Sequence, residues 1–291
     1  MTASPNPVLA HPALKGGAVA VITGAASGIG LAAARRFAAL GLKVVMVDRP
    51  GDTLEGARTL VAAEAAEGEA HVAAIPADVS RFSDLERLRD EVVDAFGPVS
   101  VLMNNAGLGA NPGKTWENLH GWRDLIDVNL WGAIHGVQAF VPAMLAGKSP
   151  GLVINTGSKQ GITLPPGNGA YNLSKAGLKA YTETLAYELQ GASAGRITAH
   201  LLIPGFTFTG MTGRDEKPAA AWSADQVVEF MLASLGRGDF YILCPDNDVP
   251  RGVDEKRIQW MADDIIQNRP ALSRWRSDHK AAFETFMKRD D

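Results

Sequence analysis

Short apolar runs that alternate with longer helical stretches constrain the fold of this 291-residue chain more than any other feature. Strands are expected at 19–23, 43–47, 71–75, 99–103, 151–155, 197–203 and 240–244, and helices at 28–40, 52–68, 83–96, 116–146, 170–190 and 225–235. This alternation is typical of βαβ units, in which parallel strands form one sheet with helices on both faces. The sequence therefore predicts an α/β fold with a single doubly wound parallel sheet of about seven strands.

Three segments of the chain are expected to behave differently. Residues 1–16 contain three prolines and no apolar run, so we expect a flexible N-terminal arm. Residues 17–245 contain no linker or repeat and form one domain. Residues 246–291 are too short for a second domain but contain a helix near 254–266. This C-terminal extension is too rich in large aromatic residues to be a solvated appendage, so it should pack on the body or on a neighbouring subunit.

Composition excludes several classes of protein. The formal net charge is −4 and both signs are interspersed, which argues against a nucleic-acid partner. Two uncharged runs, 16–34 and 128–147, have the length of a membrane span, but glycines interrupt the first and polar residues and Pro142 the second. We therefore expect no membrane partner. Cys244 is the single cysteine, which fits a reducing, cytoplasmic location, and the six histidines show no metal-ligand spacing.

A glycine-rich turn follows the first strand and opens the first helix. Gly24, Gly28 and Gly30 allow a sharp turn and a close approach of the backbone to a ligand, and Ser27 and Ile29 lie between them. The N-terminus of the helix presents free N–H groups and positive potential to a pyrophosphate. The alternative interpretation is an ordinary glycine-rich turn.

Asp48 ends the second strand, 18 residues after Gly30. A carboxylate at this place can accept hydrogen bonds from both hydroxyls of an adenosine ribose and would repel a 2′-phosphate. The sequence therefore predicts that NAD is preferred as the cofactor. Arg49 could hold a phosphate, which leaves NADP open, and Asp48 could instead be a simple turn residue before Pro50.

Polar residues follow the next strands at the same edge of the sheet. The fourth strand ends in Asn104-Asn105-Ala106-Gly107, whose small residues let the chain pass beside a flat ligand, and Ser158 follows the fifth strand. Thirteen residues later, Tyr171 and Lys175 share one face of a helix. A nearby cation lowers the pKa of a phenol, which makes the tyrosine a candidate acid/base. Turn chemistry and a surface i,i+4 pair are the alternative interpretations.

In their order and spacing these motifs, together with Pro204-Gly205, resemble the short-chain dehydrogenase/reductase family over roughly residues 16–245. The resemblance implies a Rossmann-like fold and hydride transfer between a nicotinamide cofactor and a secondary alcohol or ketone. It implies a catalytic tetrad in which Tyr171 moves the proton, Ser158 orients the carbonyl, Lys175 lowers the tyrosine pKa and grips the ribose, and Asn129 positions a relay water. Further cofactor contacts implied by the resemblance are Asp78, Val79, Thr207 and Thr209. Lys159, directly after Ser158, departs from the family pattern.

The segment after Pro204-Gly205 is expected to be a lid over the substrate, at about residues 206–222. Its apolar side chains would exclude water from hydride transfer. The expected substrate contacts are Ser158, Gln160, Leu164, Phe206, Met211 and Trp222. They predict a small-molecule secondary alcohol or ketone that is apolar or aromatic. A floppy surface loop is the alternative.

Two other functions remain open from the sequence. A dinucleotide-sensing regulatory protein could have the same fold, but it would have no need of the full tetrad. An epimerase or dehydratase of the same family would use the same residues for other chemistry. By resemblance, we expect a homodimer or homotetramer formed through the long helices on either side of the fifth strand.

Overall fold

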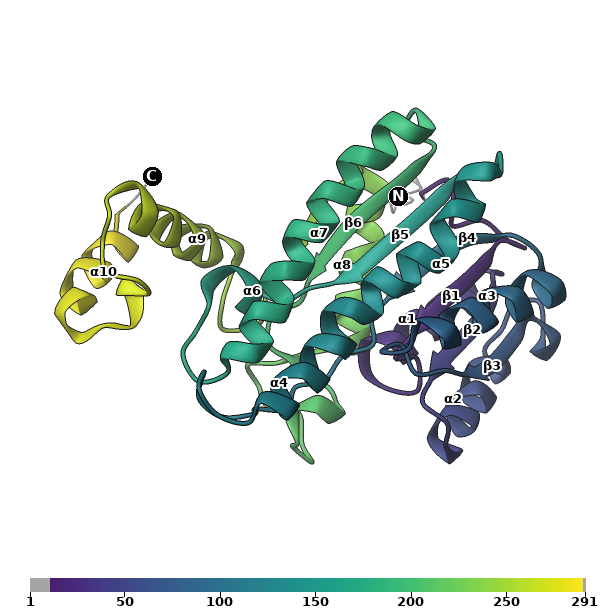
Figure 1. The fold of residues 1–291 in the computed structure, drawn as a ribbon, viewed down its shortest axis with the longest axis horizontal. Coiled ribbons are helices and arrows are strands. Elements are labelled where there is room, and N and C mark those ends of the chain that lie inside the picture. The colour runs from purple at the N-terminus through teal and green to yellow at the C-terminus, as the bar shows by residue number, and fades with distance from the viewer. Residues whose placement is uncertain (1–10, 290–291) are drawn as a thin grey trace, which may run out of the picture.

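Seven parallel strands form the central sheet of the computed structural model, which describes residues 11–289 apart from the side chain of Thr212 (Figure 1). The strands are β1 (Val19–Thr23), β2 (Lys43–Asp48), β3 (Val72–Pro76), β4 (Val99–Asn104), β5 (Gly151–Thr156), β6 (Ile197–Ile203) and β9 (Tyr241–Leu243). Their order is β3-β2-β1-β4-β5-β6-β9, and every neighbouring pair is parallel. The predicted doubly wound α/β sheet is confirmed.

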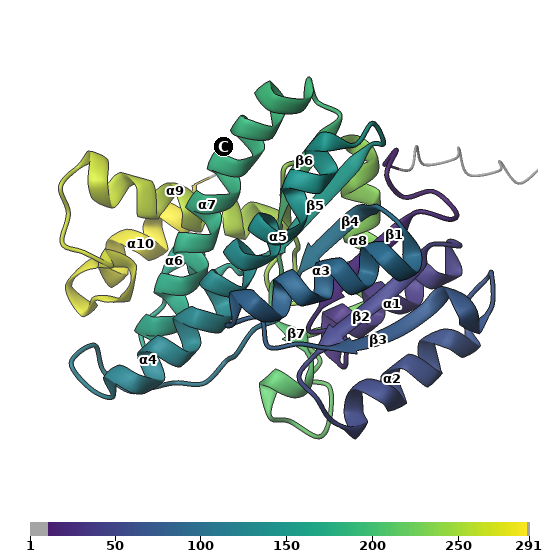
Figure 2. The same ribbon diagram turned by 45° about the vertical axis from the view of Figure 1, so that its right-hand side comes forward.

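Helices cover both faces of this sheet (Figures 1 and 2). One face packs against α1 (Gly28–Ala39), α2 (Asp52–Ala63) and α8 (Ala224–Arg237), and the other against α3 (Phe82–Phe96), α5 (Gly132–Ala146) and α7 (Gly169–Ser193). Successive strand residues alternate between the two cores: Ala20 and Ile22 of β1 join the first, Val19 and Val21 the second. Burial on both faces explains why the strands read as continuous apolar runs. Among the described residues, no helix is long and apolar enough to span a bilayer.

Several elements differ from the sequence prediction. The long helix expected at 116–146 begins only at α4 (Leu119–Ile126) and contains a π-helical segment, Asp127–Trp131, before α5. The helix expected at 52–68 ends with α2 at Ala63, and the chain then turns so that the Ala66 N–H donates to Ala38 O of α1. Additional short elements are α6 (Gln160–Thr163) and a two-stranded sheet of β7 (Thr207–Phe208) and β8 (Trp222–Ser223). Such short elements lack a hydrophobic period long enough to read from sequence.

The N-terminal segment is anchored from residue 11 onward. His11 and Leu14 are buried, and the His11 ring hydrogen-bonds to Thr198 Oγ1 of β6 at 3.0 Å. Burial, together with the neighbouring His200, lowers the pKa of His11 to about 4. The buried side chains among residues 11–16 thus hold this part of the expected arm against the body, while residues 1–10 lie outside the described part.

The C-terminal extension forms a small helical unit beyond α6 and α7, drawn in yellow in Figure 1. It consists of α9 (Arg251–Ile266), two short turns of 3₁₀ helix (Ser273–Trp275 and Ser277–His279) and α10 (Lys280–Met287). Trp260 is its centre: the ring packs against Phe283 and Phe286 at 5.2 Å each, and its N–H donates to buried Ser273 Oγ at 2.7 Å. Helix α9 contacts the body through α6.

The turn from β1 into α1 leaves no room for a side chain at Gly30. A Cβ atom built on Gly30 would lie 2.2 Å from the carbonyl oxygen of Gly24 and 2.6 Å from Asn105 Nδ2. Both neighbours are fixed, since Asn105 Nδ2 donates to the Thr23 and Gly24 carbonyls at 3.1 and 3.3 Å. Only a residue without a side chain fits between the first helix and the end of β4.

We expect Gly30→Ala to destabilise the protein by about 1–3 kcal/mol, because the added methyl group must displace backbone rather than a flexible side chain. Gly56→Ala is the matched control, since Gly56 is exposed in α2 and a Cβ there would have no neighbour within 4 Å. That control should gain about 0.5–1 kcal/mol from helix propensity. Denaturant unfolding of both variants measures the difference, and equal stability would contradict the close packing at Gly30.

Candidate active site

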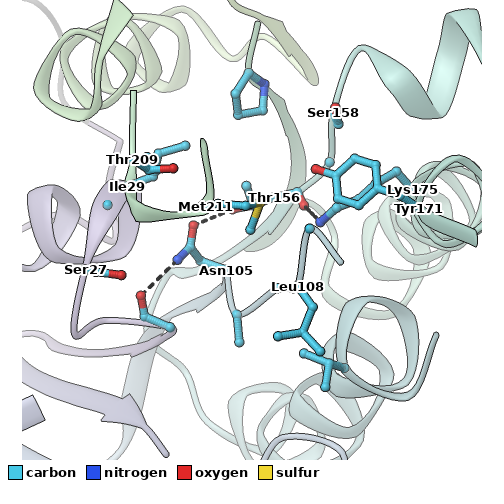
Figure 3. Close-up of a pocket in the computed structure, with 18 of the residues that line it drawn as sticks. Ser27, Ile29, Asn105, Leu108, Thr156, Ser158, Tyr171, Lys175, Thr209 and Met211 are labelled. Carbon is cyan, nitrogen blue, oxygen red and sulfur yellow. Dashed lines mark hydrogen bonds between the residues drawn. The ribbon is translucent and has the colours of Figure 1, made fainter. Parts of the chain in front are cut away.

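A cavity of about 930 Å³ opens at the carboxyl ends of the parallel strands. Figure 3 shows Ser27 and Ile29 toward one end and Ser158, Tyr171 and Lys175 toward the other. The loops that follow β1, β2, β4, β5 and β6 all contribute to its walls. The predicted site residues found on these walls are Gly24, Ser27, Gly28, Ile29, Asp48, Arg49, Asp78, Val79, Asn105, Ala106, Gly107, Ser158, Gln160, Tyr171, Lys175, Pro204, Gly205, Phe206, Thr207, Thr209 and Met211.

A chain of hydrogen bonds joins three of the strand ends at the cavity, and Figure 3 shows the part between Asn105, Thr156 and Lys175. Thr23 Oγ1 at the end of β1 accepts the N–H of Asn105 at 3.0 Å. Thr156 Oγ1 at the end of β5 donates to Asn105 Oδ1 at 3.2 Å, and Lys175 Nζ donates to Thr156 O at 2.7 Å. These hydrogen bonds fix the position of the glycine-rich turn relative to α7, the helix that carries Tyr171.

Helix α7 positions Tyr171 and Lys175 on one face. Asn168 caps the helix, since its side chain accepts the Tyr171 N–H at 3.1 Å, so Tyr171 lies in the first turn. Burial raises the pKa of the Tyr171 phenol, and a hydrogen bond with Ser158 partly opposes this. From the sequence, Lys175 is expected to lower this pKa. In the structure the ammonium lies 5.8 Å from the ring centre and donates to Thr156 O, and burial dominates.

Lys175 is itself a buried cation, only 4% exposed. Burial lowers the pKa of its ammonium to about 8. The group is therefore protonated at neutral pH, with one N–H bond committed to the Thr156 carbonyl. A buried cation with donors to spare can hold a hydroxyl or stabilise a developing negative charge.

Asn129 lies in the π-helical segment and behind the cavity wall. Its Oδ1 accepts the Leu108 N–H at 2.7 Å, its Nδ2 donates to Leu108 O at 2.9 Å, and Nδ2 also reaches Ser174 Oγ at 3.3 Å. The Asn129 side chain thus fixes the backbone at Leu108. It also contacts Ser174, which lies between Tyr171 and Lys175 on α7. The hydrogen bonds of Asn129 therefore hold residues that surround the cavity.

The other end of the cavity fits an elongated anionic ligand. Helix α1 begins at Gly28, and its N-cap residue Ser27 makes no capping hydrogen bond through its side chain. The N-terminus of a helix carries N–H groups and positive potential that suit a phosphate. Asp48 Oδ2 accepts the Ala26 N–H at 3.0 Å, so its carboxylate is fixed beside the glycine-rich turn. Arg49 is exposed at the rim. The Asp48 carboxylate, the N-terminus of α1 and the Tyr171 phenol thus lie along one cavity.

Five predicted site residues lie off the cavity wall. Gly30 supports the turn from below, and Asn104 donates from its side chain to Asn155 inside the sheet at 2.8 Å. Asn129 acts through Leu108. Leu164 ends α6 in a left-handed conformation outside the wall. The expected substrate contact of Trp222 is absent, because β8 pairs with β7 and the ring packs on Phe230 and the first core.

The structure adds wall residues that the sequence analysis missed. Leu108 and Gly109 extend the Asn104–Gly107 run by two residues, and Met211 lies against Gly109. Thr156 ends β5 one residue beyond the expected strand, and a polar residue at a strand end was the available signal. Lys159 also lines the wall. Among the described residues, no group of three His, Cys, Asp or Glu side chains could hold a metal ion.

Comparisons with known proteins agree on one family. The family model described as short chain dehydrogenase matches residues 18–220. A 1-deoxy-11-beta-hydroxypentalenate dehydrogenase from Streptomyces exfoliatus is 36% identical over 230 residues, covering 77% of this chain and 81% of the relative. A 3beta-hydroxysteroid dehydrogenase 1 from Eggerthella lenta is 40% identical over 176 residues, covering 60% and 66%.

Solved structures give the same answer. A short-chain dehydrogenase/reductase from Burkholderia phymatum in complex with NAD has a TM-score of 0.78 and 30% identity, covering 89% of this chain and 97% of that one. A metagenomic short-chain oxidoreductase in complex with NADP has a TM-score of 0.62 and 31% identity, covering 77% and 91%. By its fold, its cavity and these matches, the chain belongs to the short-chain dehydrogenase/reductase family and is an oxidoreductase.

Proposed function

We propose that this enzyme interconverts a secondary alcohol and a ketone, with Tyr171 as the general acid/base and NAD as the preferred cofactor. The observation that carries the proposal is the convergence of Ser158, Tyr171 and Lys175 on one end of a cavity whose other end fits a dinucleotide. A bound nicotinamide dinucleotide supplies or accepts the hydride. The protein must then move one proton, hold the substrate oxygen and exclude water.

Tyr171 is suited to that proton transfer. Its raised pKa keeps the phenol protonated at neutral pH, so Oη can donate a proton to the carbonyl oxygen as a ketone is reduced. In the oxidation of an alcohol, the phenolate takes the proton back. Ser158, hydrogen-bonded to the phenol, can orient the substrate oxygen between the two hydroxyls.

Lys175 and Asn129 complete the tetrad. The Lys175 ammonium has donors beyond its bond to Thr156 O and can hold a ribose hydroxyl while stabilising the phenolate during oxidation. Asn129 keeps Leu108 and Ser174 in place. It also lies in the π-helical segment, whose irregular backbone hydrogen bonding is suited to holding a relay water.

Tyr171→Phe keeps the ring but removes the proton, and we expect turnover to fall by at least ~10²-fold while cofactor binding is retained. Tyr187→Phe is the matched control, because Tyr187 lies on the same helix but is 84% exposed. Steady-state rates and NAD titration measure both effects. Near-normal turnover in Tyr171→Phe would assign the acid/base to another residue.

The raised pKa of Tyr171 also predicts different pH profiles for the two directions. Alcohol oxidation needs the phenolate, so kcat/KM should rise with pH, whereas ketone reduction needs the phenol and should not rise. Rates measured in both directions between about pH 6 and 9 test this. An oxidation rate that is flat over that range would argue against a phenol that titrates above it.

The preference for NAD rests on Asp48. Its carboxylate is held at the end of β2 by the Ala26 and Arg49 N–H groups, at 3.0 and 2.8 Å. A negative charge fixed there accepts ribose hydroxyls and repels a 2′-phosphate. Solved relatives of this chain bind NAD in one case and NADP in another, so the family does not decide the question.

We expect Asp48→Ala to narrow the preference for NAD over NADP, because the repulsion of the 2′-phosphate is removed. Asp52→Ala, an exposed carboxylate at the start of α2, is the control for a general change of charge. Dissociation constants for both cofactors are the measurement. A wild-type protein that turns over NADP as well as NAD would refute the assignment.

The substrate end of the cavity supports an apolar ligand. Leu108, Phe206 and Met211 line it, and Met211, 54% exposed, lies on the segment that β7 and β8 close into a loop. We propose that this loop is the lid and that the substrate is a hydrophobic, small-molecule secondary alcohol or ketone. The names of the two dehydrogenases compared above, a hydroxypentalenate and a hydroxysteroid enzyme, agree with this proposal.

A panel of secondary alcohols with NAD tests the substrate class. Cyclic and aromatic alcohols should have higher kcat/KM than short polar alcohols and sugars. Their apolar surface would be buried against the apolar side chains of the lid, which favours binding. The absorbance of the reduced nicotinamide gives the rates. A panel led by small polar alcohols would count against an apolar pocket.

We also propose a homodimer or homotetramer in the cytoplasm. Apolar side chains stand exposed on the helices around β5, including Leu119 at 67%, Trp131 at 47% and Leu173 at 52%. A second copy packed on these helices would bury them. The single cysteine, Cys244, is buried and free, which suits a reducing compartment.

A further inference from the structure

Lys159, which directly follows Ser158, is joined to the C-terminal extension by ion pairs. Its Nζ lies 2.6 Å from Asp254 Oδ2 of α9 and 3.2 Å from Asp246 Oδ2, in the loop after β9. The side chains of the two aspartates are only 5% and 6% exposed, and that of Lys159 is 15% exposed. We call these three residues the lysine clamp.

The clamp reaches the lid through Asp246. Asp246 Oδ2 also accepts the Phe206 N–H at 3.2 Å, and Oδ1 accepts the Val249 N–H at 2.8 Å. A Cβ atom on Gly205 would lie 2.6 Å from Asp246 Oδ2 and 2.9 Å from Lys159 Nζ, so the ion pair lies directly against the backbone at Gly205. The start of the lid is therefore tied to the same carboxylate as Lys159.

The clamp reaches Ser158 through the backbone. Lys159 precedes α6, and its carbonyl accepts the Ile162 and Thr163 N–H groups at 3.0 Å each. Ser158 Oγ accepts the N–H of Gln160 at 3.1 Å, so the hydroxyl is oriented by the turn that Lys159 begins. A shift of Lys159 toward or away from α9 would move this turn.

Attachment of the extension alone does not require these charges. Ile258 of α9 already packs against the apolar cluster formed by β6 and β9, as does Ile162 of α6. Burying charged groups costs free energy, and well-packed apolar residues stabilise such a contact as well or better. A buried ion cluster instead fixes the distances and directions between its charged side chains. Arg257, 4.0 Å from Asp254, brings the cluster close to neutrality.

We propose that Lys159 is a positioning residue through which the C-terminal extension aligns Ser158 and the start of the lid for the substrate. The proposal rests on the alcohol–ketone chemistry assigned above to Ser158 and Tyr171. In this proposal the C-terminal extension supports the substrate end of the cavity. The cofactor end does not depend on the extension.

Asp254→Asn tests the clamp from the side that is remote from the reacting atoms. It removes one charge without changing the size of the side chain, and kcat/KM should fall by about 10- to 10²-fold, the effect of a small misplacement of a reacting group. Affinity for NAD should be unchanged, and Asp254→Glu should recover part of the activity. The matched control is Glu255→Gln, since Glu255 is next on α9 but pairs with Arg251 at 2.6 Å in solvent.

Amide hydrogen exchange supplies a readout that needs no substrate. In Asp254→Asn the segments 158–164 and 206–211 should exchange faster than in Glu255→Gln, and Lys159→Met should show the same pattern if Asp254→Asn does not fold. Equal exchange and equal kcat/KM in Asp254→Asn and Glu255→Gln would overturn the clamp. Full activity in Tyr171→Phe would instead overturn the proposed function and leave the exchange result standing.

Discussion

The side chain of Asn105 holds the reactive edge of the sheet together. Its backbone N–H binds Thr23 Oγ1, its Nδ2 binds the Thr23 and Gly24 carbonyls, and its Oδ1 accepts from Thr156, so one residue bridges the ends of three parallel strands. Parallel strands end with backbone groups that need partners, and these bonds provide them at the site where a ligand must enter. Lys175 extends the same chain to α7. The residues that line the cavity are thus anchored to the ends of the strands.

Much of this arrangement could be predicted from the sequence, because it depends on local patterns. Every strand of the sheet was expected within about two residues of its observed bounds, since strands buried on both faces give unbroken apolar runs. The glycine-rich turn and the Tyr171–Lys175 pair were equally readable, because each is set by spacing within one element. Most of the expected cofactor-binding residues lie on one cavity wall because parallel strands all end at the same edge.

The features that could not be predicted depend on residues far apart in the sequence. In the π-helical segment, Asn129 binds Leu108, 21 residues away, and the segment has no signature of its own in the sequence. Trp222 was expected to face the substrate, but the pairing of β8 with β7 turns it onto Phe230. The pKa of Tyr171 is raised because burial, a property of the whole fold, outweighs the hydrogen bond with Ser158. Lys159 could be noticed but not explained, because its partners lie 87 and 95 residues later.

The position of those partners has a consequence for how the enzyme is made. Synthesis runs from the N-terminus, and the sheet up to β6 can assemble from segments that are already present. Asp246 and Asp254 emerge after all seven strands of the sheet, so a nascent chain carries the Lys159 ammonium beside Ser158 before either carboxylate exists to surround it. The corner of the cavity around Lys159 is therefore completed after the strands that form the nucleotide half. A chain that is cut short before residue 246 would have its nucleotide half and lack the finished corner.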